Sequence, residues 1–290
     1  MKTVLATGER PMRPVPHSER YVQLSDVRVH FDLADYSDPW KEPETVLLHH
    51  GFARNLEFWR PWVPLLARHY RVLRYDSRGH GKTTIPPPGV PYTLDQMVDN
   101  AVALLDVLEI DKVHWAGEAS GGIVGMAVAL AHPDRIASLT LCNTPFRLLP
   151  STNELFVPEE VQAHGLAYWA RKTLSNRIDV DKAEPEWIEW SIAQLDRTPP
   201  HIAIAEHKML EAGDFFPRLR EIRQPVLIMA GDQGKIAPKE QMEQMAAQMP
   251  NARLHLFQGY RQGIAFTAPE RCAAQMRAFL AEITPTEPQR

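Results

Sequence analysis

Short apolar runs alternate with amphipathic segments along most of this chain. The runs of strand length lie at 45–49, 71–75, 112–117, 136–142, 225–230 and 252–257. Segments with helical spacing of apolar residues separate them. In the clearest of these, Thr93 and Gln96 have the spacing of a capping box, and the apolar residues from Leu94 to Leu108 fall on one helical face. Strands that alternate with helices in this way predict an α/β fold, in which a parallel sheet carries helices on both faces.

Two regions depart from this alternation. Residues 21–32 alternate apolar and polar positions with a break at Ser25-Asp26, which predicts a β-hairpin. Between 147 and 216 the strand pattern disappears, and amphipathic helical stretches follow at 161–174 and 186–195. We therefore predict three parts, with their boundaries as follows: an extended N-terminal arm at 1–19, an α/β core at 20–146 and 217–285, and a helical lid at 147–216.

Composition narrows the class of protein. A chain of 290 residues with 44% hydrophobic content can bury a large core, and its net charge of −4 leaves no electrostatic footprint for nucleic acid or an anionic membrane. The two cysteines, Cys142 and Cys272, lie in apolar patterns and are predicted to be buried and unbridged. No stretch approaches the roughly 18 apolar residues of a membrane span. We expect a cytoplasmic monomer or homodimer that binds a small molecule and needs neither cofactor nor metal.

The most informative motif is Gly117-Glu118-Ala119-Ser120-Gly121, which joins an apolar strand to an apolar helix. In a G-x-S-x-G turn of this kind, the strand-to-helix connection is so sharp that its third residue, the nucleophilic serine, stands above the sheet. Here the third residue is Ala119, whose methyl group cannot attack a carbonyl carbon. A shifted register would place Ser120 at the apex, but it would also put the bulky Glu118 at a position that favours a small residue.

Other segments resemble those of the α/β-hydrolase superfamily, and the resemblance covers roughly residues 20–283. Leu47-Leu48-His49-His50-Gly51-Phe52 is similar to the H-G-x turn that supplies an oxyanion-hole amide, residues 58–66 are similar to the helix after it, and residues 75–83 are similar to the D-x-R-G-H-G-x-[ST] loop. Residues 138–145 are most similar to enol-lactonases and small-ester hydrolases. The resemblance implies an α/β-hydrolase fold, with a mostly parallel twisted sheet, helices on both faces and an inserted helical lid.

The resemblance also implies that all three positions of the catalytic triad are substituted. Ala119 holds the nucleophile position, and the acid of the G-x-x-D-x-x-x-P pattern at 231–238 falls on Gly234. The histidine position, seven residues before the Pro-Glu pair at 269–270, falls on Gln262, which does not titrate near neutral pH and cannot serve as a general base. Natural loss of the triad is the most economical interpretation. The alternatives are deliberate substitution, the shifted register, or an acid relocated to Asp232 or Asn143.

The remaining pocket keeps groups that polarise a ligand. We expect the backbone amides of Phe52 and Ser120 to converge above the turn, where they can hold a carbonyl oxygen, an enolate or a carboxylate. Glu118 is the candidate for retained chemistry, because burial raises the pKa of a carboxyl group towards neutrality. The alternative is a structural Glu118 that accepts a hydrogen bond from Trp115 or Arg78.

Further residues are candidates for contact with a substrate. Arg54 and Arg261 could clamp a carboxylate, although either could equally be a solvated loop residue. The other candidates are His50, Asn143, Tyr168 and Trp169. Each could instead have a purely structural role, in a loop or in the core of the lid. The spacing of His201 and His207 around Glu206 does not match a zinc site.

Two classes of function remain open. The first is an enzyme with non-serine chemistry on a small carbonyl, ester or lactone-like compound: a lyase, decarboxylase, isomerase or hydratase, or an atypical hydrolase whose water is activated by Glu118 or Asp232. Glu118, Arg54, Arg261 or Gln262 would then polarise the substrate. The second is an inactive pseudo-hydrolase that binds a small acyl or carboxylate ligand. The retained glycines and H-G turn favour the enzyme, because the fold does not need them for stability.

Overall fold

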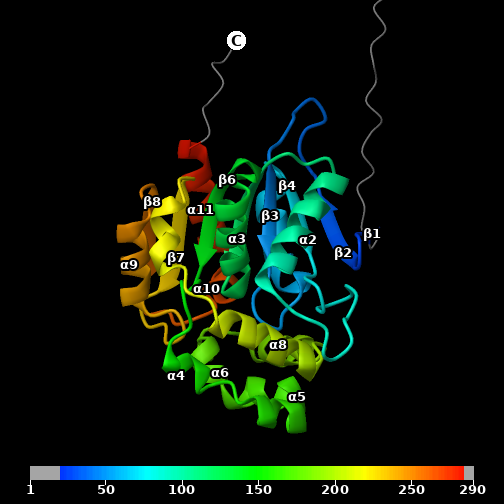
Figure 1. Cartoon of the computed structure of the whole chain (residues 1–290). Coiled ribbons are helices and arrows are strands. Elements are labelled where there is room, and N and C mark those ends of the chain that lie inside the picture. Colours follow the sequence, from blue (N-terminus) through cyan, green and yellow to red (C-terminus); the bar gives the residue numbers. More distant parts are fainter. Residues whose placement is uncertain (1–19, 284–290) are drawn as a thin grey trace, which may run out of the picture.

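The structure is a computed structural model and describes residues 20–283, so the predicted arm at 1–19 lies outside the described residues. Eight strands form one sheet in the order β1-β2-β4-β3-β5-β6-β7-β8 (Figure 1). Their bounds are β1 (Arg20–Gln23), β2 (Arg28–Ala34), β3 (Thr45–His49), β4 (Arg71–Tyr75), β5 (Val113–Glu118), β6 (Ile136–Cys142), β7 (Val226–Gly231) and β8 (Ala252–Phe257). The strands from β4 through β8 in this order pair in parallel, and β2 pairs antiparallel with β1 and β4. The predicted fold class and the N-terminal hairpin are confirmed.

Helices cover both faces of the sheet because alternate side chains of each buried strand point to opposite sides. In β3, Leu47 packs into one hydrophobic cluster, whereas Val46 and Leu48 pack into the other. The first cluster contains apolar residues of α2 (Leu94–Val107), α3 (Ser120–Ala131) and α9 (Lys239–Gln248). The second contains those of η1 (Leu56–Trp62), α1 (Val63–Leu66), α10 (Ile264–Thr267) and α11 (Pro269–Ile283). The short η2 (Pro133–Arg135) leads into β6.

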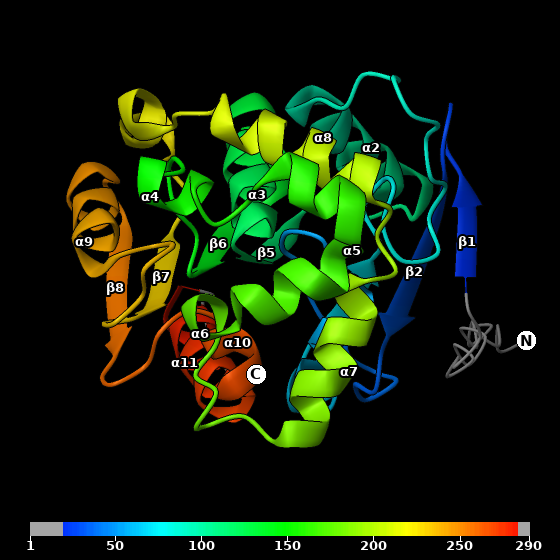
Figure 2. The same ribbon diagram turned by 90° about the horizontal axis from the view of Figure 1, so that it is seen from below.

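A helical segment connects β6 to β7 and lies beside one end of the sheet (Figures 1 and 2). It contains α4 (Pro150–Asn153), α5 (Pro158–Lys172), α6 (Leu174–Arg177), α7 (Pro185–Leu195), α8 (Pro200–Glu211) and η3 (Phe216–Glu221). Helix α5 is interrupted at Gly165, whose φ of 78° and ψ of 176° are not helical. The division of the chain into a core and a separate lid stays a prediction.

Local sequence explains where α2 begins and which form the helix after the H-G turn takes. The Thr93 side chain accepts a hydrogen bond from the Gln96 amide, and the Gln96 side chain accepts one from the Thr93 amide, so the predicted capping box is confirmed. The helix expected at 58–66 is present as a 3-10 helix followed by a single α-helical turn. Pro61 and Pro64 account for this form, because proline has no N–H to donate to the preceding turn.

Candidate functional site

The turn between β5 and α3 holds Ala119 in a strained backbone conformation. Ala119 has φ 48° and ψ −115°, a region that L-residues rarely occupy. The turn is also tightly packed, because a Cβ atom at Gly117 would overlap the backbone of Gly121, and one at Gly121 would overlap the carbonyl oxygen of His49. The expectation that the fold does not need these glycines was therefore wrong, since the packing of the sheet and α3 requires them. The strained residue at this strand-to-helix turn is therefore Ala119, with Ser120 already the first residue of α3.

The hydroxyl group of Ser120 points to a buried acid rather than to a base. Ser120 Oγ donates a hydrogen bond of 3.0 Å to Oε1 of Glu206 in α8, and Glu206 Oε2 lies 3.1 Å from Nε2 of His80. Burial is the largest single influence on the pKa of Glu206 and raises it, but His80, together with hydrogen bonds from the Ala53 amide and Ser120, lowers this pKa below the usual range. A carboxylate that releases its proton so readily is a weak base, so this contact does not activate Ser120 as a nucleophile.

Among the backbone amides beside the turn that have no hydrogen-bond acceptor within residues 20–283, two are relevant to an oxyanion hole. They are the N–H groups of Phe52, in the loop after β3, and of Ser120. The amides that follow Phe52 are engaged, since Ala53 donates to Glu206 Oε2 at 3.2 Å and Arg54 donates to the Gly51 carbonyl at 3.1 Å. The unengaged pair are the amides expected to form an oxyanion hole.

Glu118, the last residue of β5, forms an ion pair with Arg54. Arg54 Nη1 donates to Glu118 Oε2, and both side chains are almost fully buried. Glu118 Oε1 has no hydrogen-bond partner in the described part of the chain. Burial raises the pKa of Glu118, and the positive charge of Arg54 only partly opposes that rise. A side chain at position 51 would overlap Glu118 Oε2, so Gly51 leaves the room in which the pair forms.

The structural alternative for Glu118 named the wrong partners. Trp115 Nε1 donates to the Gly121 carbonyl at 3.0 Å, where it supports the start of α3. Arg78 pairs with Asp26 at 2.7 Å. Arg54 takes their place because the loop after β3 folds back over the end of β5, and the guanidinium group also lies 4.9 Å from the ring centre of Phe266.

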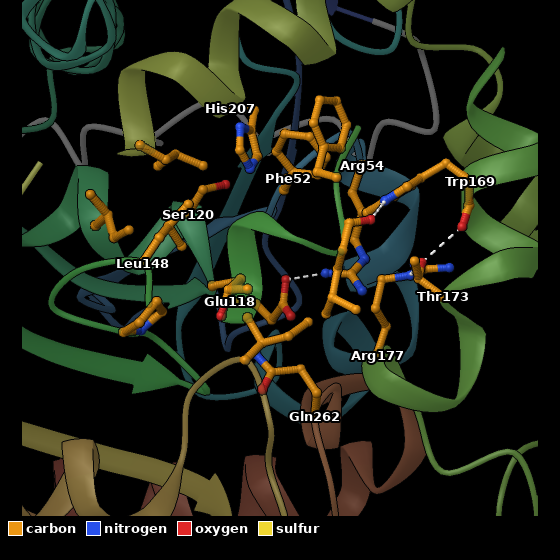
Figure 3. A pocket seen from close by; sticks show the side chains of 18 residues that line it. Phe52, Arg54, Glu118, Ser120, Leu148, Trp169, Thr173, Arg177, His207 and Gln262 are labelled. Atoms are coloured by element: carbon orange, nitrogen blue, oxygen red, sulfur yellow. Dashed lines mark hydrogen bonds and ion pairs between the residues drawn. The ribbon is translucent and has the colours of Figure 1, made fainter. Parts of the chain in front are cut away.

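A cavity of about 90 Å³ lies above the turn, between the sheet and the helical segment (Figure 3). The wall contains three charged side chains, Glu118, Arg54 and Arg177. It also contains His207, whose pKa is lowered by burial, so that its ring is neutral at neutral pH. The apolar part of the wall comes from both sides of the cavity and includes Phe52, Ala119, Ile123, Leu148, Leu155, Phe156, Trp169, Leu210 and Ile236.

Arg177, at the end of α6, is a charged residue that sequence reasoning missed. Its Nε donates to Thr173 Oγ1 at 3.0 Å, its Nη2 donates to the Ala170 carbonyl at 2.7 Å, and the group lies 4.6 Å from the ring centre of Trp169. Burial, and then the charge of Arg54, lower the pKa of Arg177 to about 9, so it carries a positive charge at neutral pH. Sequence reasoning also missed the role of Glu206, which contacts Ser120 from outside the cavity wall.

A helical pattern could have indicated both missed residues. Ile202, Glu206 and Leu210 are spaced by four, which places the acid on the buried face of α8. Thr173 and Arg177 have the same spacing and are both buried. A charged residue on an otherwise buried helical face is a signal for a functional or paired group, because charged side chains are almost never fully buried without a partner.

The predicted histidine and acid positions of the triad lie next to each other. Gln262 lines the cavity with Ala119; its Nε2 donates to the Asn143 carbonyl at 3.0 Å, and its Oε1 accepts from the Ala237 amide at 3.3 Å. A Cβ atom at Gly234 would lie 3.6 Å from Gln262 Oε1. An acid at 234 would thus be adjacent to a histidine at 262, but in this chain Gln262 links loops through its two hydrogen bonds.

Several other candidate residues have structural contacts and are not part of the cavity wall. Asp232 Oδ1 accepts from the Gly259 amide at 2.8 Å, and Asn143 Oδ1 accepts from the Ile264 amide at 3.3 Å. His50 Nε2 accepts from the Ser77 amide at 3.0 Å, and burial lowers the pKa of this ring well below its usual value.

The remaining two candidates, Tyr168 and Arg261, also lie outside the cavity wall. Tyr168 is 42% exposed, and its ring lies 4.8 Å from that of His164 on the same helix. The backbone amide of Arg261 donates to Asp179 Oδ2 at 2.8 Å. Of the residues proposed from sequence to bind substrate, the structure brings Arg54 and Trp169 to the cavity, together with Phe52 and Ser120 of the expected oxyanion hole.

Residues 20–283 contain no group of three or more His, Cys, Asp or Glu side chains placed to hold a metal ion. None of the helices described in that range is both long and apolar enough to cross a membrane. Cys142 and Cys272 are buried free thiols, as the sequence predicts.

Comparison with known proteins assigns the family. The family described as "alpha/beta hydrolase fold" matches residues 44–181. A protein of Caulobacter segnis named "Putative carbamate hydrolase RutD" is 30% identical over 246 residues, which cover 82% of this chain and 91% of that protein. The chain therefore belongs to the α/β-hydrolase superfamily.

Solved structures of the same superfamily have a closely similar fold. The enol-lactonase from Burkholderia xenovorans LB400 has a TM-score of 0.83 and 25% identity, and the match covers 90% of this chain and all of that one. A hydrolase from Pseudomonas aeruginosa PA01 has a TM-score of 0.82 and 30% identity over 91% of this chain and 98% of that one. The similarity to an enol-lactonase agrees with the resemblance of residues 138–145.

Proposed function

We propose that this chain is an enzyme that acts on a small carbonyl compound by proton transfer, without a serine nucleophile or a Ser-His-Asp triad. The observation that carries the proposal is the pairing of Ala119 at the apex of the turn with a fully buried carboxylate, Glu118, in the same cavity. Gly234 and Gln262 supply neither an acid nor a base. Glu118 is therefore the ionisable acid in the cavity wall available for chemistry.

The free oxygen of Glu118 is suited to removing a proton from the carbon next to a carbonyl group. The electron pair of that C–H bond then moves onto the carbonyl oxygen and forms an enolate. The N–H groups of Phe52 and Ser120, at the positive end of α3, stabilise the negative oxygen. Return of the proton at another position gives an isomerase, and loss of a leaving group from the adjacent carbon gives a lyase. The raised pKa of Glu118 favours both directions of transfer near neutral pH.

The relatives support the substrate class rather than the reaction. One is named for carbamate hydrolysis and another for the hydrolysis of an enol lactone, and both names describe compounds with a polarised carbonyl group. We propose that this chain keeps a pocket for a small ester-, lactone- or carbamate-like compound. Hydrolysis by a water molecule activated by Glu118 is the variant of the mechanism closest to these names.

The second candidate function is a pseudo-hydrolase that binds a small acyl or carboxylate ligand. The Arg54–Glu118 ion pair favours it, because a carboxylate bonded to a guanidinium group is a weaker base than a free one. In this alternative Glu118 orients Arg54 towards a ligand and takes no part in a reaction.

Deuterium exchange distinguishes the two functions. The chain is incubated in D₂O with a panel of small ketones, oxo acids, lactones and esters, and loss of C–H signals next to the carbonyl group is followed by proton NMR. We expect exchange that Glu118→Gln abolishes. Glu189→Gln is the matched control, since Glu189 is an exposed acid in α7 that pairs with Arg171. Equal exchange by the parent and Glu118→Gln would exclude Glu118 as the proton carrier.

Two other results would favour a different function. Ligand binding in calorimetry without exchange or turnover would support the pseudo-hydrolase. Rapid release of a stoichiometric burst of alcohol from an activated ester, with acylation of Ser120 found by mass spectrometry, would support a serine hydrolase and overturn the proposal.

A further inference from the structure

Arg177 is a buried cation in the cavity wall without an anionic partner. It is 6% exposed, and no carboxylate in the described part of the chain lies within 4.0 Å of its guanidinium nitrogens. Nε and Nη2 donate to Thr173 and Ala170, whereas Nη1 makes no hydrogen bond within residues 20–283. Neutral oxygens satisfy two donors of the group, and no carboxylate pairs with it directly; the charge of Glu118 favours the charged form of Arg177 only from a longer distance.

The other charged residues of the cavity do not supply the missing anion. Glu118 is already bonded to Arg54, so the two arginines and one glutamate leave a net charge of +1 in the wall. Glu206 is outside the wall and is engaged by His80, Ser120 and the Ala53 amide. Burial of an unpaired charge is unfavourable unless a partner neutralises it. A ligand anion in the cavity would provide that partner.

We propose that Arg177 binds the carboxylate group of the substrate while the reacting carbonyl group lies at the amides of Phe52 and Ser120. The placement of the carbonyl group in this inference rests on the proposed function. The inference narrows the substrate to a small carboxylic acid that also contains a carbonyl group. A single carboxylate matches the excess of one positive charge. The cavity volume of about 90 Å³ and the largely apolar remainder of its wall favour a compact acid over a phosphate ester.

The surroundings of Arg177 hold the guanidinium group in one orientation. The Trp169 ring lies 4.6 Å from it, and Thr173 and Ala170, one and two turns earlier along the same stretch of chain, accept two of its hydrogen bonds. These contacts fix the plane of the fork, so that the remaining nitrogen meets a ligand oxygen without further loss of side-chain freedom. Lysine has no planar fork and could not keep these contacts together.

Calorimetric titration with acetate, propionate and succinate tests the proposal, with acetamide and propionamide as neutral probes of similar shape and sodium chloride to keep the ionic strength constant. Arg177→Met removes the charge and retains an apolar stem, and Arg177→Lys retains the charge alone. Arg171→Met is the matched control, because Arg171 lies in α5 nearby, is exposed and pairs with Glu189. We expect Arg177→Met to weaken carboxylate binding about 10- to 100-fold, the range for a charged hydrogen bond, with a smaller loss for Arg177→Lys.

The binding of neutral amides should be the same in the parent and in all three variants. Arg177→Met should unfold at a temperature equal to or above that of the parent, because it removes an unpaired buried charge, so lost binding would not reflect misfolding. Equal carboxylate affinity in Arg177→Met and the parent would overturn the proposal, as would equal affinity of the parent for acetate and acetamide. Failure of Glu118-dependent exchange with carboxylate binding intact would instead refute the proposed function alone.

Discussion

Replacing Arg54 by methionine should destabilise the fold, because Glu118 would remain buried without its counter-ion. The side chains of Arg54 and Glu118 are 6% and 1% exposed, so solvent does little to screen the pair. Methionine keeps an apolar stem near the rings of Phe58 and Phe266, which lie 5.3 and 4.9 Å from the guanidinium carbon. The principal change is therefore the lost charge, and removal of one partner from a buried ion pair costs about 3–5 kcal/mol.

The loss should depend on pH, and its sign follows from the pKa of Glu118. Burial already holds this pKa above its ordinary value, and removal of Arg54 raises it further, because Arg54 is the main group that lowers it. Below the unfolded pKa of about 4.3 the carboxyl group is protonated in both states, and no charge is buried. As the pH rises above that value, the unfolded chain ionises first and the folded state loses relative stability. Arg54→Met should therefore be closer to the parent at pH 5 than at pH 8.

Urea denaturation followed by tryptophan fluorescence measures this effect. With a slope of about 3 kcal/mol/M, the expected loss lowers the midpoint by about 1–2 M at pH 8. Arg54→Met/Glu118→Gln should recover part of the loss and remove its pH dependence. Arg68→Met is the control, since Arg68 is exposed and pairs with Asp38. The reasoning would be refuted if the urea midpoint of Arg54→Met equalled that of the parent at pH 8. It would also be refuted if Arg54→Met and Arg54→Met/Glu118→Gln lost the same stability at pH 5 and at pH 8.

Three further predictions concern the turn and the triad positions. Serine-directed phosphonate probes should not label Ser120, and hydrolysis of short activated esters should be negligible in a spectrophotometric assay; stoichiometric labelling would contradict this. Ala119→Gly should raise the free energy of unfolding by about 1 kcal/mol, because glycine removes part of the 1–3 kcal/mol of backbone strain; a lower urea midpoint would count against it. The triple variant Ala119→Ser, Gly234→Asp and Gln262→His should show esterase activity near background. The Arg54–Glu118 ion pair remains in the cavity, and a side chain at 234 crowds the adjacent loop. Robust esterase activity of this variant would favour the pseudo-hydrolase.

Local pattern was sufficient to predict the fold, because strand length, capping and turn residues are encoded over short distances. The Thr93 capping box and the apolar strands are examples. The helix expected after the H-G turn is present, but its 3-10 form was not predicted; the two prolines at 61 and 64 limit the hydrogen bonds that a regular α-helix needs.

The charges of the cavity could not be assigned to partners from the sequence. Arg54 and Glu118 are 64 positions apart, and their contact depends on how the loop after β3 folds over the end of β5. The Ser120–Glu206 contact joins residues 86 positions apart, and it requires α8 to dock against the start of α3. Periodicity within one element says nothing about such docking, although a charged residue on a buried helical face does indicate that a partner is needed.

The strained turn, with Ala119 at its apex, gives the candidate site a defined geometry. Gly117 and Gly121 allow the backbones of β5, α3 and the end of β3 to approach closely, and Ala119 between them has a positive φ of 48°. That conformation places Glu118 beneath the cavity and leaves the Ser120 amide free at the start of α3. The strained conformation of Ala119 thus positions the Glu118 carboxyl group and the Ser120 amide, although the Ala119 methyl group itself is unreactive. A proton-transfer site at Glu118 therefore requires the same turn that a serine nucleophile would have required.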